Sequence, residues 1–444
     1  MEPVQNQLGS KRNTIAAIVI IGIMFFIFGL VSWVNAILIP YFKIACELTH
    51  FESYFVAFAF YIAYFCLSIP AAYLLNKIGY KRGIMYGFIC MSVGAALFIP
   101  AALARTYWIF LTGLFVIGAG LTILQSAANP YITIIGPIES AARRISIMGI
   151  CNKFAGIISP LIFAAVVLRV TDSEMFTLLD SGTLDEVSKN MMLDELIRRV
   201  IKPYAILSAG LLAFGIYIRY SVLPEINPEE TNKETGSETH KTSIMQFPYL
   251  ILGAVALFLH VGTQVVAIDT VISYAGSMGM DLFEAKTFPS YTLTATIIGY
   301  MAGIFLIPRF ISQTRALQVC CSLGLIFSIA IILVNKEVVV LGHASNLSIW
   351  FLCALGLPNS LIYAGIWPLS IHGLGRFTKV GSSLLIMGLS GNAIMPIIYG
   401  YYADIWSLQK AYWILIPCYI YLIFFAFYGY KILTWTPKKK KMTY

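Results

Sequence analysis

The chain has 444 residues, of which 59% are hydrophobic and only 11% are charged. An ordinary soluble domain carries about 25% charged residues, so this composition excludes a protein whose main solvent is water. The net charge of +9 could suggest a nucleic-acid partner, but in a membrane chain a basic balance reflects cytoplasmic loops, and no nucleic-acid partner is expected.

Long runs with few charges follow one another along the chain, each long enough to cross a hydrocarbon core of about 30 Å as a helix of roughly 20 residues. Helices are predicted because they satisfy their own backbone groups in lipid, whereas barrel strands would be about 10 residues of alternating character. The first run is too long for a signal peptide and is taken as a retained span. The runs are residues 14–39, 55–75, 83–103, 107–135, 145–168 and 204–222, then 247–274, 288–307, 317–334, 347–371, 380–402 and 411–430.

Two longer stretches interrupt this series. Residues 169–202 form an outer loop whose apolar pattern around Met175 and Met191 predicts short amphipathic helices on the outer surface. Residues 223–246 are rich in Pro, Glu, Asn, Thr and Ser and predict a cytoplasmic linker. The predicted fold is an all-α integral membrane protein with 12 transmembrane helices in two six-helix bundles, residues 1–222 and 247–444.

The two halves carry traces of a duplication. Ser146-Ile147-Met148-Gly149-Ile150 is followed by Pro160, and Leu385-Ile386-Met387-Gly388-Leu389 is followed by Pro396, at matching places in the two halves. Duplicated bundles fit a carrier that rocks around a site near the bilayer midplane. A channel or a membrane enzyme could also be duplicated.

The basic residues predict the orientation. Lys and Arg concentrate on the side of both termini and the linker, which places both termini in the cytoplasm. The eight cysteines lie in or beside apolar runs without a pairing pattern, and we interpret them as small buried hydrophobic residues.

Several motifs carry a family resemblance. The loop Asn76-Lys77-Ile78-Gly79-Tyr80-Lys81-Arg82 resembles the G-x-x-x-D-R-x-G-R-R loop of the major facilitator superfamily. More specifically, nearly the whole chain resembles the fucose permease and glucose/galactose transporter family, through residues 34–40, 118–131, 359–360, 372–375 and 378–382. The resemblance implies a pseudo-symmetric major facilitator fold and uptake of a monosaccharide across a bacterial inner membrane.

The chain departs from this family where the family binds protons. Fucose permease-like members carry an acid after the first-span asparagine and another in the fourth span, and these places hold Ala36 and Gln125. Neither side chain can exchange a proton, so coupling through these two positions is not expected.

Amide side chains inside the spans are the substrate candidates. Gln125 and Asn129 lie four residues apart on one helix face, and amides offer both donors and acceptors to sugar hydroxyls. The alternative for these residues is interhelical hydrogen bonding, or, for Asn129, satisfying backbone groups freed by Pro130. The resemblance places Asn35, Gln264 and Asn359 in spans that line the central cavity. Asn152 and Tyr363 are further substrate candidates, and for Tyr363 packing or interface anchoring is the alternative.

Three ionisable residues inside the spans are candidates for coupling. A charge near the bilayer centre costs roughly 3 kcal/mol on insertion scales, which makes Lys153 and Asp269 functional candidates. Lys153 could instead snorkel or pair structurally, and Asp269 could be a paired or vestibule carboxylate. His260 is either a hydrogen-bonded core residue or a group that contacts substrate or a proton.

The leading function is therefore secondary transport of a monosaccharide, with glucose or galactose favoured and fucose or an N-acetylhexosamine as alternatives. Proton symport through Asp269 or His260, sodium symport and uncoupled uniport all remain open. An exporter on the same fold and a membrane enzyme are the other classes, and the sequence holds no enzyme motif. We expect no cofactor and no metal. We expect the protein to be a monomer in the lipid bilayer.

Overall fold

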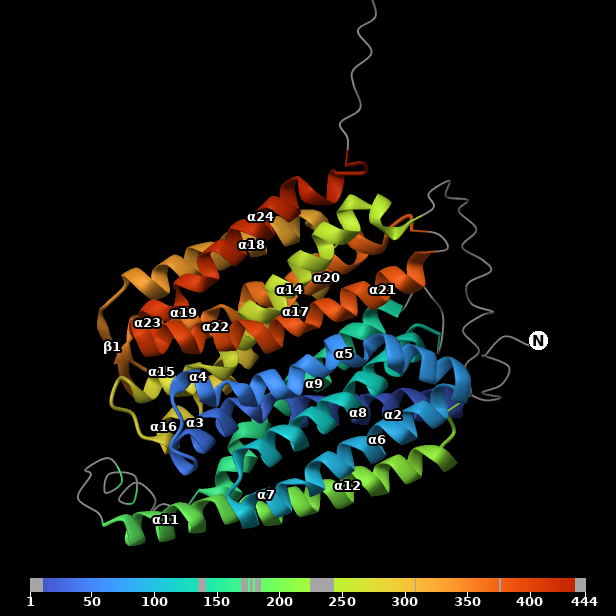
Figure 1. The fold of residues 1–444 in the computed structure, drawn as a ribbon. Helices are drawn as coiled ribbons and strands as arrows, with labels where there is room; N and C mark the ends of the chain where they lie inside the picture. Colours follow the sequence, from blue (N-terminus) through green and yellow to red (C-terminus); the bar gives the residue numbers. More distant parts are fainter. Residues whose placement is uncertain are drawn as a thin grey trace, which may run out of the picture.

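The computed structural model describes residues 11–134, 141–168, 175, 179, 185–223, 243–307, 309–374 and 377–435. Within them the chain is a helical membrane protein of two bundles that lie side by side (Figure 1). The first bundle comprises α2 Lys11–Trp33, α3 Asn35–Ala45, α4 His50–Ser53, α5 Phe55–Ile78, α6 Tyr80–Ala96, α7 Phe98–Ala104, α8 Tyr107–Ile134, α9 Ala141–Val167, α11 Glu186–Arg198 and α12 Ile201–Tyr220.

The second bundle begins after the part of the predicted linker that lies outside the described residues. Its helices are η2 Ile244–Gln246, α14 Pro248–Asp269, α15 Val271–Gly276, α16 Leu282–Ala285, α17 Phe288–Leu306, α18 Gln313–Leu333, α19 Leu347–Ala354, α20 Gly356–Ile371, α21 Thr378–Met387, η4 Gly388–Ser390, α22 Gly391–Ile405, α23 Leu408–Ala411, η5 Tyr412–Ile414, α24 Leu415–Phe427 and η6 Gly429–Lys431. We call the end with α3, α4, α11 and α15 the outer end, following the charge distribution.

The predicted spans appear as helices, with differences in detail. Eleven candidate membrane spans are found in the described part of the chain. Helix α17, which is not among the eleven, corresponds to the eighth predicted span and packs against α9 and α20. The first predicted span is broken at Val34 into α2 and α3. In the predicted outer loop, Met191 lies on α11, an exposed amphipathic helix as expected, while most of residues 169–184 fall outside the described residues.

A β-hairpin after α18 was not predicted. Strands β1 Glu337–Val340 and β2 His343–Asn346 pair antiparallel, with Val340 opposite His343. Leu341 and Gly342 form the two-residue turn with φ of 52° and 87°, the left-handed backbone that short hairpin turns require. The hairpin projects at the outer end, where β1 is labelled in Figure 1.

Glycines allow the helices of the first bundle to pack closely. A Cβ on Gly118 of α8 would overlap the carbonyl oxygen of Phe60 on α5. On the other side of α8, a Cβ on Gly120 would overlap the carbonyl of Gly87 on α6. Small residues give membrane helices their close approach, since lipid supplies no hydrophobic drive between them. The glycines therefore fix the position of α8, which carries Gln125.

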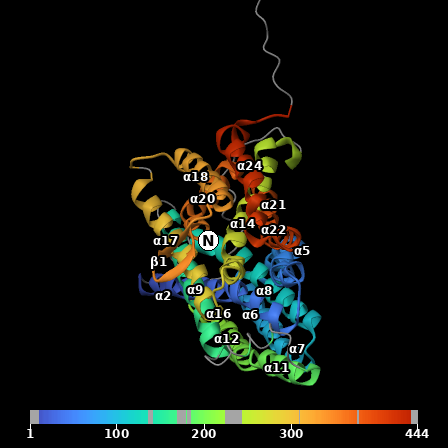
Figure 2. The same cartoon turned by 90° about the vertical axis from the view of Figure 1, so that its left-hand side faces the viewer.

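The two bundles meet along two contact regions. In the first region α5 packs against α21 and α22, and in the second α9 packs against α17. Ser290 of α17 donates a 2.7 Å hydrogen bond to the backbone carbonyl of Ile157 on α9. The view onto the outer end in Figure 2 shows the second bundle above the first, with α9 and α17 on one side and α5 and α22 on the other.

The outer ends of the bundles are in contact. The Asp404 carboxylate at the end of α22 accepts backbone hydrogen bonds from His50, at 3.1 Å, and from Phe51, at 2.8 Å. A Cβ on Gly400 would overlap the Tyr54 ring, so the helices approach closely here. α3 also contacts α14 and α15 at this end. This structure is therefore closed on the outer side, and we call the Asp404 contact with α4 the outer latch.

We expect Asp404→Ala to shift the carrier toward the form that is open on the outer side. Hydrogen bonds to a charged group contribute about 1.5–3 kcal/mol. Because the carboxylate is exposed, we expect the lower value, which corresponds to about a tenfold shift in the equilibrium between the closed and open forms. Spin-label distances between the outer ends of α4 and α22 would measure it. The matched control is Asp194→Ala, because Asp194 pairs with Arg105 at 3.4 Å inside the first bundle. An equal shift in both variants would contradict the latch.

His50 gives the outer latch a pH dependence. Burial and the Lys43 ammonium lower the pKa of His50 from 6.5 to about 4, and Lys43 Nζ lies 2.7 Å from its Nε2. Because the closed form favours the neutral ring, His50 supports closure above about pH 6.5 and opposes it increasingly as pH falls toward 4. We expect His50→Gln to be more closed than the wild type at pH 5 and equally closed at pH 7.5, by the same distance measurement. Identical curves would exclude His50 as a titrating group.

Candidate functional site

Lys153 joins the two bundles at the centre of the molecule. Its ammonium nitrogen lies 3.4 Å from Oε1 of Gln264 on α14, in the second bundle. The same nitrogen lies 4.0 Å from the centre of the Trp33 ring on α2, in the first bundle, which is a cation–π contact. Only 7% of Lys153 is exposed. The structure thus brings two predicted residues together, one from each half.

Asn152 orients the Trp33 ring. Its Oδ1 accepts a 3.2 Å hydrogen bond from the Trp33 indole, and its Nδ2 donates to the Phe25 carbonyl at 3.3 Å. A Cβ on Gly156, one turn further along α9, would overlap the Trp33 ring. The ring is therefore held between α2 and α9 with its face toward Lys153. We call Trp33, Asn152, Lys153 and Gln264 the central cluster.

The fourth-span candidates differ in what their side chains do. Nε2 of Gln125 donates a 2.8 Å hydrogen bond to the hydroxyl of Tyr64 on α5. The Thr122 hydroxyl is fully buried and donates to the Gly118 carbonyl within its own helix, so it is already satisfied. Asn129 lies on α8, but its side chain is outside what the structure describes. Gln125 keeps its amide oxygen available for a second partner.

Asn359 and Tyr363 lie on α20 of the second bundle. Oδ1 of Asn359 accepts a 2.7 Å hydrogen bond from Tyr419, while its Nδ2 is buried without a hydrogen-bond partner among the described residues. The rings of Tyr363 and Trp367 stack with their centres 5.7 Å apart. Stacked aromatic faces suit the apolar face of a pyranose ring.

Three predicted residues are deeply buried with unpaired polar atoms. The amide of Asn35, both ring nitrogens of His260 and both carboxyl oxygens of Asp269 have no hydrogen-bond partner among the described residues. Each of the three side chains is at most 1% exposed. Native proteins leave few buried polar atoms unpaired, so these three positions stay candidates for a functional role.

Sequence reasoning missed the aromatic partners of these residues. Trp33, Tyr64 and Tyr419 each bond a predicted amide or contact Lys153, and each was part of an apolar run in the sequence. Asn392 on α22 was also missed, although its Oδ1 is buried without a partner among the described residues. The sequence could have indicated Asn392, because it is an amide inside the eleventh predicted span.

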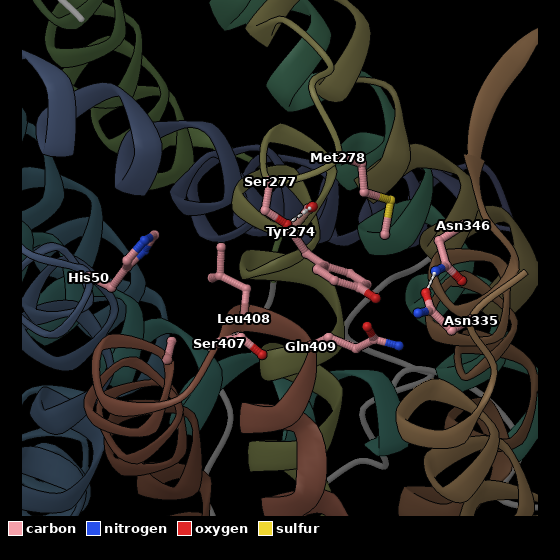
Figure 3. A pocket seen from close by; sticks show the side chains of 10 residues that line it. His50, Tyr274, Ser277, Met278, Asn335, Asn346, Ser407, Leu408 and Gln409 are labelled. Carbon is pink, nitrogen blue, oxygen red and sulfur yellow. Dashed lines mark hydrogen bonds between the residues drawn. The ribbon is translucent and has the colours of Figure 1, made fainter. Parts of the chain in front are cut away.

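One cavity lies apart from the central cluster. It has a volume of about 480 Å³ and opens at the outer end between α4, α15, the hairpin and α23 (Figure 3). Its lining includes the polar side chains of Asn335, Asn346, Ser407 and Gln409. None of the predicted substrate residues lines it. Within the described residues, no group of three or more His, Cys, Asp or Glu side chains could hold a metal ion.

Two helical bundles that share a buried polar cluster, and that are closed on one side, define a membrane carrier. The chain belongs to the Major Facilitator Superfamily, whose family model matches residues 21–376.

Curated relatives match over nearly the whole chain. The glucose/galactose transporter of Brucella abortus biovar 1 (strain 9-941) is 32% identical over 434 residues, 97% of this chain and 98% of that protein. The L-fucose-proton symporter of Escherichia coli (strain K12) is 30% identical over 405 residues, 90% of each chain.

A solved structure supports the same assignment. The Major Facilitator Superfamily transporter FucP, in the outward conformation, matches with a TM-score of 0.67 and 27% identity, over 95% of this chain and 100% of that one. The family resemblance and the two-bundle fold predicted from the sequence are therefore confirmed.

Proposed function

We propose that this protein carries a monosaccharide, a hexose such as glucose or galactose, across the membrane by alternating access. The observation that carries the proposal is the central cluster, in which Lys153 contacts Gln264 of one bundle and Trp33 of the other, and Asn152 holds the Trp33 ring. Amides and an indole offer hydrogen bonds and a stacking face to a neutral polyol. The names of the two curated relatives support a sugar as the solute.

The site we infer extends the central cluster to Gln125 on α8 and to Asn359 and Tyr363 on α20. We place the protein in a bacterial inner membrane, as the family resemblance implies, and both termini in the cytoplasm, as the charge distribution predicts. We expect it to be a monomer. The unit boundaries we infer are residues 1–222 and 247–444, with the linker 223–246 between them.

The test is uptake of labelled monosaccharides into proteoliposomes that contain the purified chain. We expect saturable uptake of glucose or galactose and competition by the other sugar. Separately imposed proton and sodium gradients would identify the driving ion, and uptake that responds to neither would mean a uniporter. If no monosaccharide shows saturable uptake, the proposal is wrong, and export of another small solute is the alternative.

A further inference from the structure

A carboxyl group is sealed between the bundles at the closed outer end. Asp269 is the last residue of α14, and its side chain is 0% exposed. The segment α14–α15 contacts α3 at this place. Neither carboxyl oxygen has a hydrogen-bond partner among the described residues, and Asn35 at the start of α3 is equally buried. These unpaired groups point to a site rather than to packing.

The ionisable groups that face Asp269 come from the other bundle. Lys153 on α9, Tyr61 on α5 and Tyr54 at the start of α5 each interact with it electrostatically. On its own bundle, the neighbouring Thr270 bonds the Tyr412 hydroxyl at 2.7 Å. Because the ionisable groups that interact with it lie in the first bundle, closing the outer end creates the surroundings of Asp269, and opening removes them.

Lys153 does not neutralise Asp269 by direct contact. Its ammonium group is engaged by Gln264 and Trp33, and no described residue donates a hydrogen bond to the carboxyl group. An ionised carboxylate buried in this way is strongly unfavourable, whereas a neutral carboxyl group avoids most of the cost. The closed form therefore suits an Asp269 that carries a proton.

We propose that Asp269 is the proton-binding group of the carrier, an inference that rests on the proposed sugar transport. A proton from the external water binds an oxygen of the carboxylate in the form open to the outside. The neutral acid is then sealed when the outer end closes, and the proton passes to the internal water after the inner side opens. Proton binding and outer closure favour each other by linkage. One acid in the second bundle thereby replaces acids at Ala36 and Gln125 in the first.

The test compares sugar exchange with proton movement in the same proteoliposomes. Labelled-galactose counterflow without any gradient reports exchange, and a pH dye trapped inside reports proton entry when sugar is added outside. The wild type should show both. Asp269→Asn keeps the shape of the neutral acid, so counterflow should remain while proton entry is lost. Asp269→Glu keeps a carboxyl group and should keep both activities.

The matched control is Asp281→Asn. Asp281 accepts a 2.7 Å hydrogen bond from the backbone of Glu284 on the outer surface, and asparagine can cap that helix equally. Both activities should persist in this variant. Sugar-driven proton entry that survives in Asp269→Asn would overturn the proposal.

Failure of the proposed function gives a different result, because the wild type would then show no counterflow. Wild-type counterflow without proton entry, with or without sodium stimulation, would reject the proton site and leave sugar transport standing. If Asp269→Asn does not fold, the wild type can be treated with a hydrophobic carbodiimide, which modifies protonated carboxyl groups. Loss of proton entry should then accompany a label on Asp269, and a label confined to other carboxyl groups would contradict the proposal.

Discussion

Replacing Lys153 with methionine is expected to lower the transport efficiency, kcat/KM, by about ten- to a hundredfold. Methionine keeps most of the length but removes the charge that contacts Gln264 in one bundle and Trp33 in the other. A lost hydrogen bond to a charged group corresponds to about 1.5–3 kcal/mol. Because Lys153 spans the bundles, both sugar binding and closure should suffer. Initial rates of labelled-sugar uptake over a range of concentrations would measure the effect.

Two comparisons make the Lys153 result specific. Lys410→Met removes an exposed lysine at the outer end and should leave the rates unchanged. A monodisperse elution profile in detergent, matching the wild type, would show that Lys153→Met is folded. Normal uptake by a folded Lys153→Met variant would exclude Lys153 from the site.

Gly118→Ala should destabilise the first bundle by about 1–3 kcal/mol, the usual cost of overpacking. The added methyl group would overlap the Phe60 carbonyl where α8 and α5 are closest. The displaced helix carries Gln125, so uptake should fall together with the thermal unfolding temperature in detergent.

Gly210→Ala provides the matched comparison on another helix. No atom lies within 4 Å of a Cβ at Gly210 on α12, and alanine is the better helix former. We expect no loss of stability or uptake in this variant. Equal unfolding temperatures for the two variants would show that α8 and α5 can separate without cost.

Local chemistry limited what could be predicted at the edges of the fold. The break at Val34 separates α2 from α3 inside one continuous apolar run, so no change in composition marked it. The hairpin turn at Leu341 and Gly342 requires positive φ at both residues, and a leucine gives no signal for that backbone. The amphipathic helix α11 could be predicted because its apolar residues recur with helical spacing.

The site was predicted as a set of residue types but not as a set of contacts. Buried amides and charges are costly in lipid, so Gln125, Lys153, Gln264 and Asp269 stood out in apolar runs. Trp33 and Tyr64 did not, because an aromatic residue in an apolar run is usually packing. Gln264 and Asp269 lie on one helix, and Lys153 from the other bundle contacts Gln264 and interacts electrostatically with Asp269. The spacing of the two residues could not predict this link.

The sequence by itself determined that the protein lies in a lipid bilayer, that it is helical, that it divides into two bundles, and to which family it belongs. It could do so because crossing a bilayer imposes length and polarity on each segment separately. Only the tertiary structure decided that Lys153 joins the bundles, that Asp404 holds the outer end closed and that Asp269 is sealed behind it. Those facts depend on distances between residues far apart in the chain, which are fixed by how two bundles pack and not by any one helix.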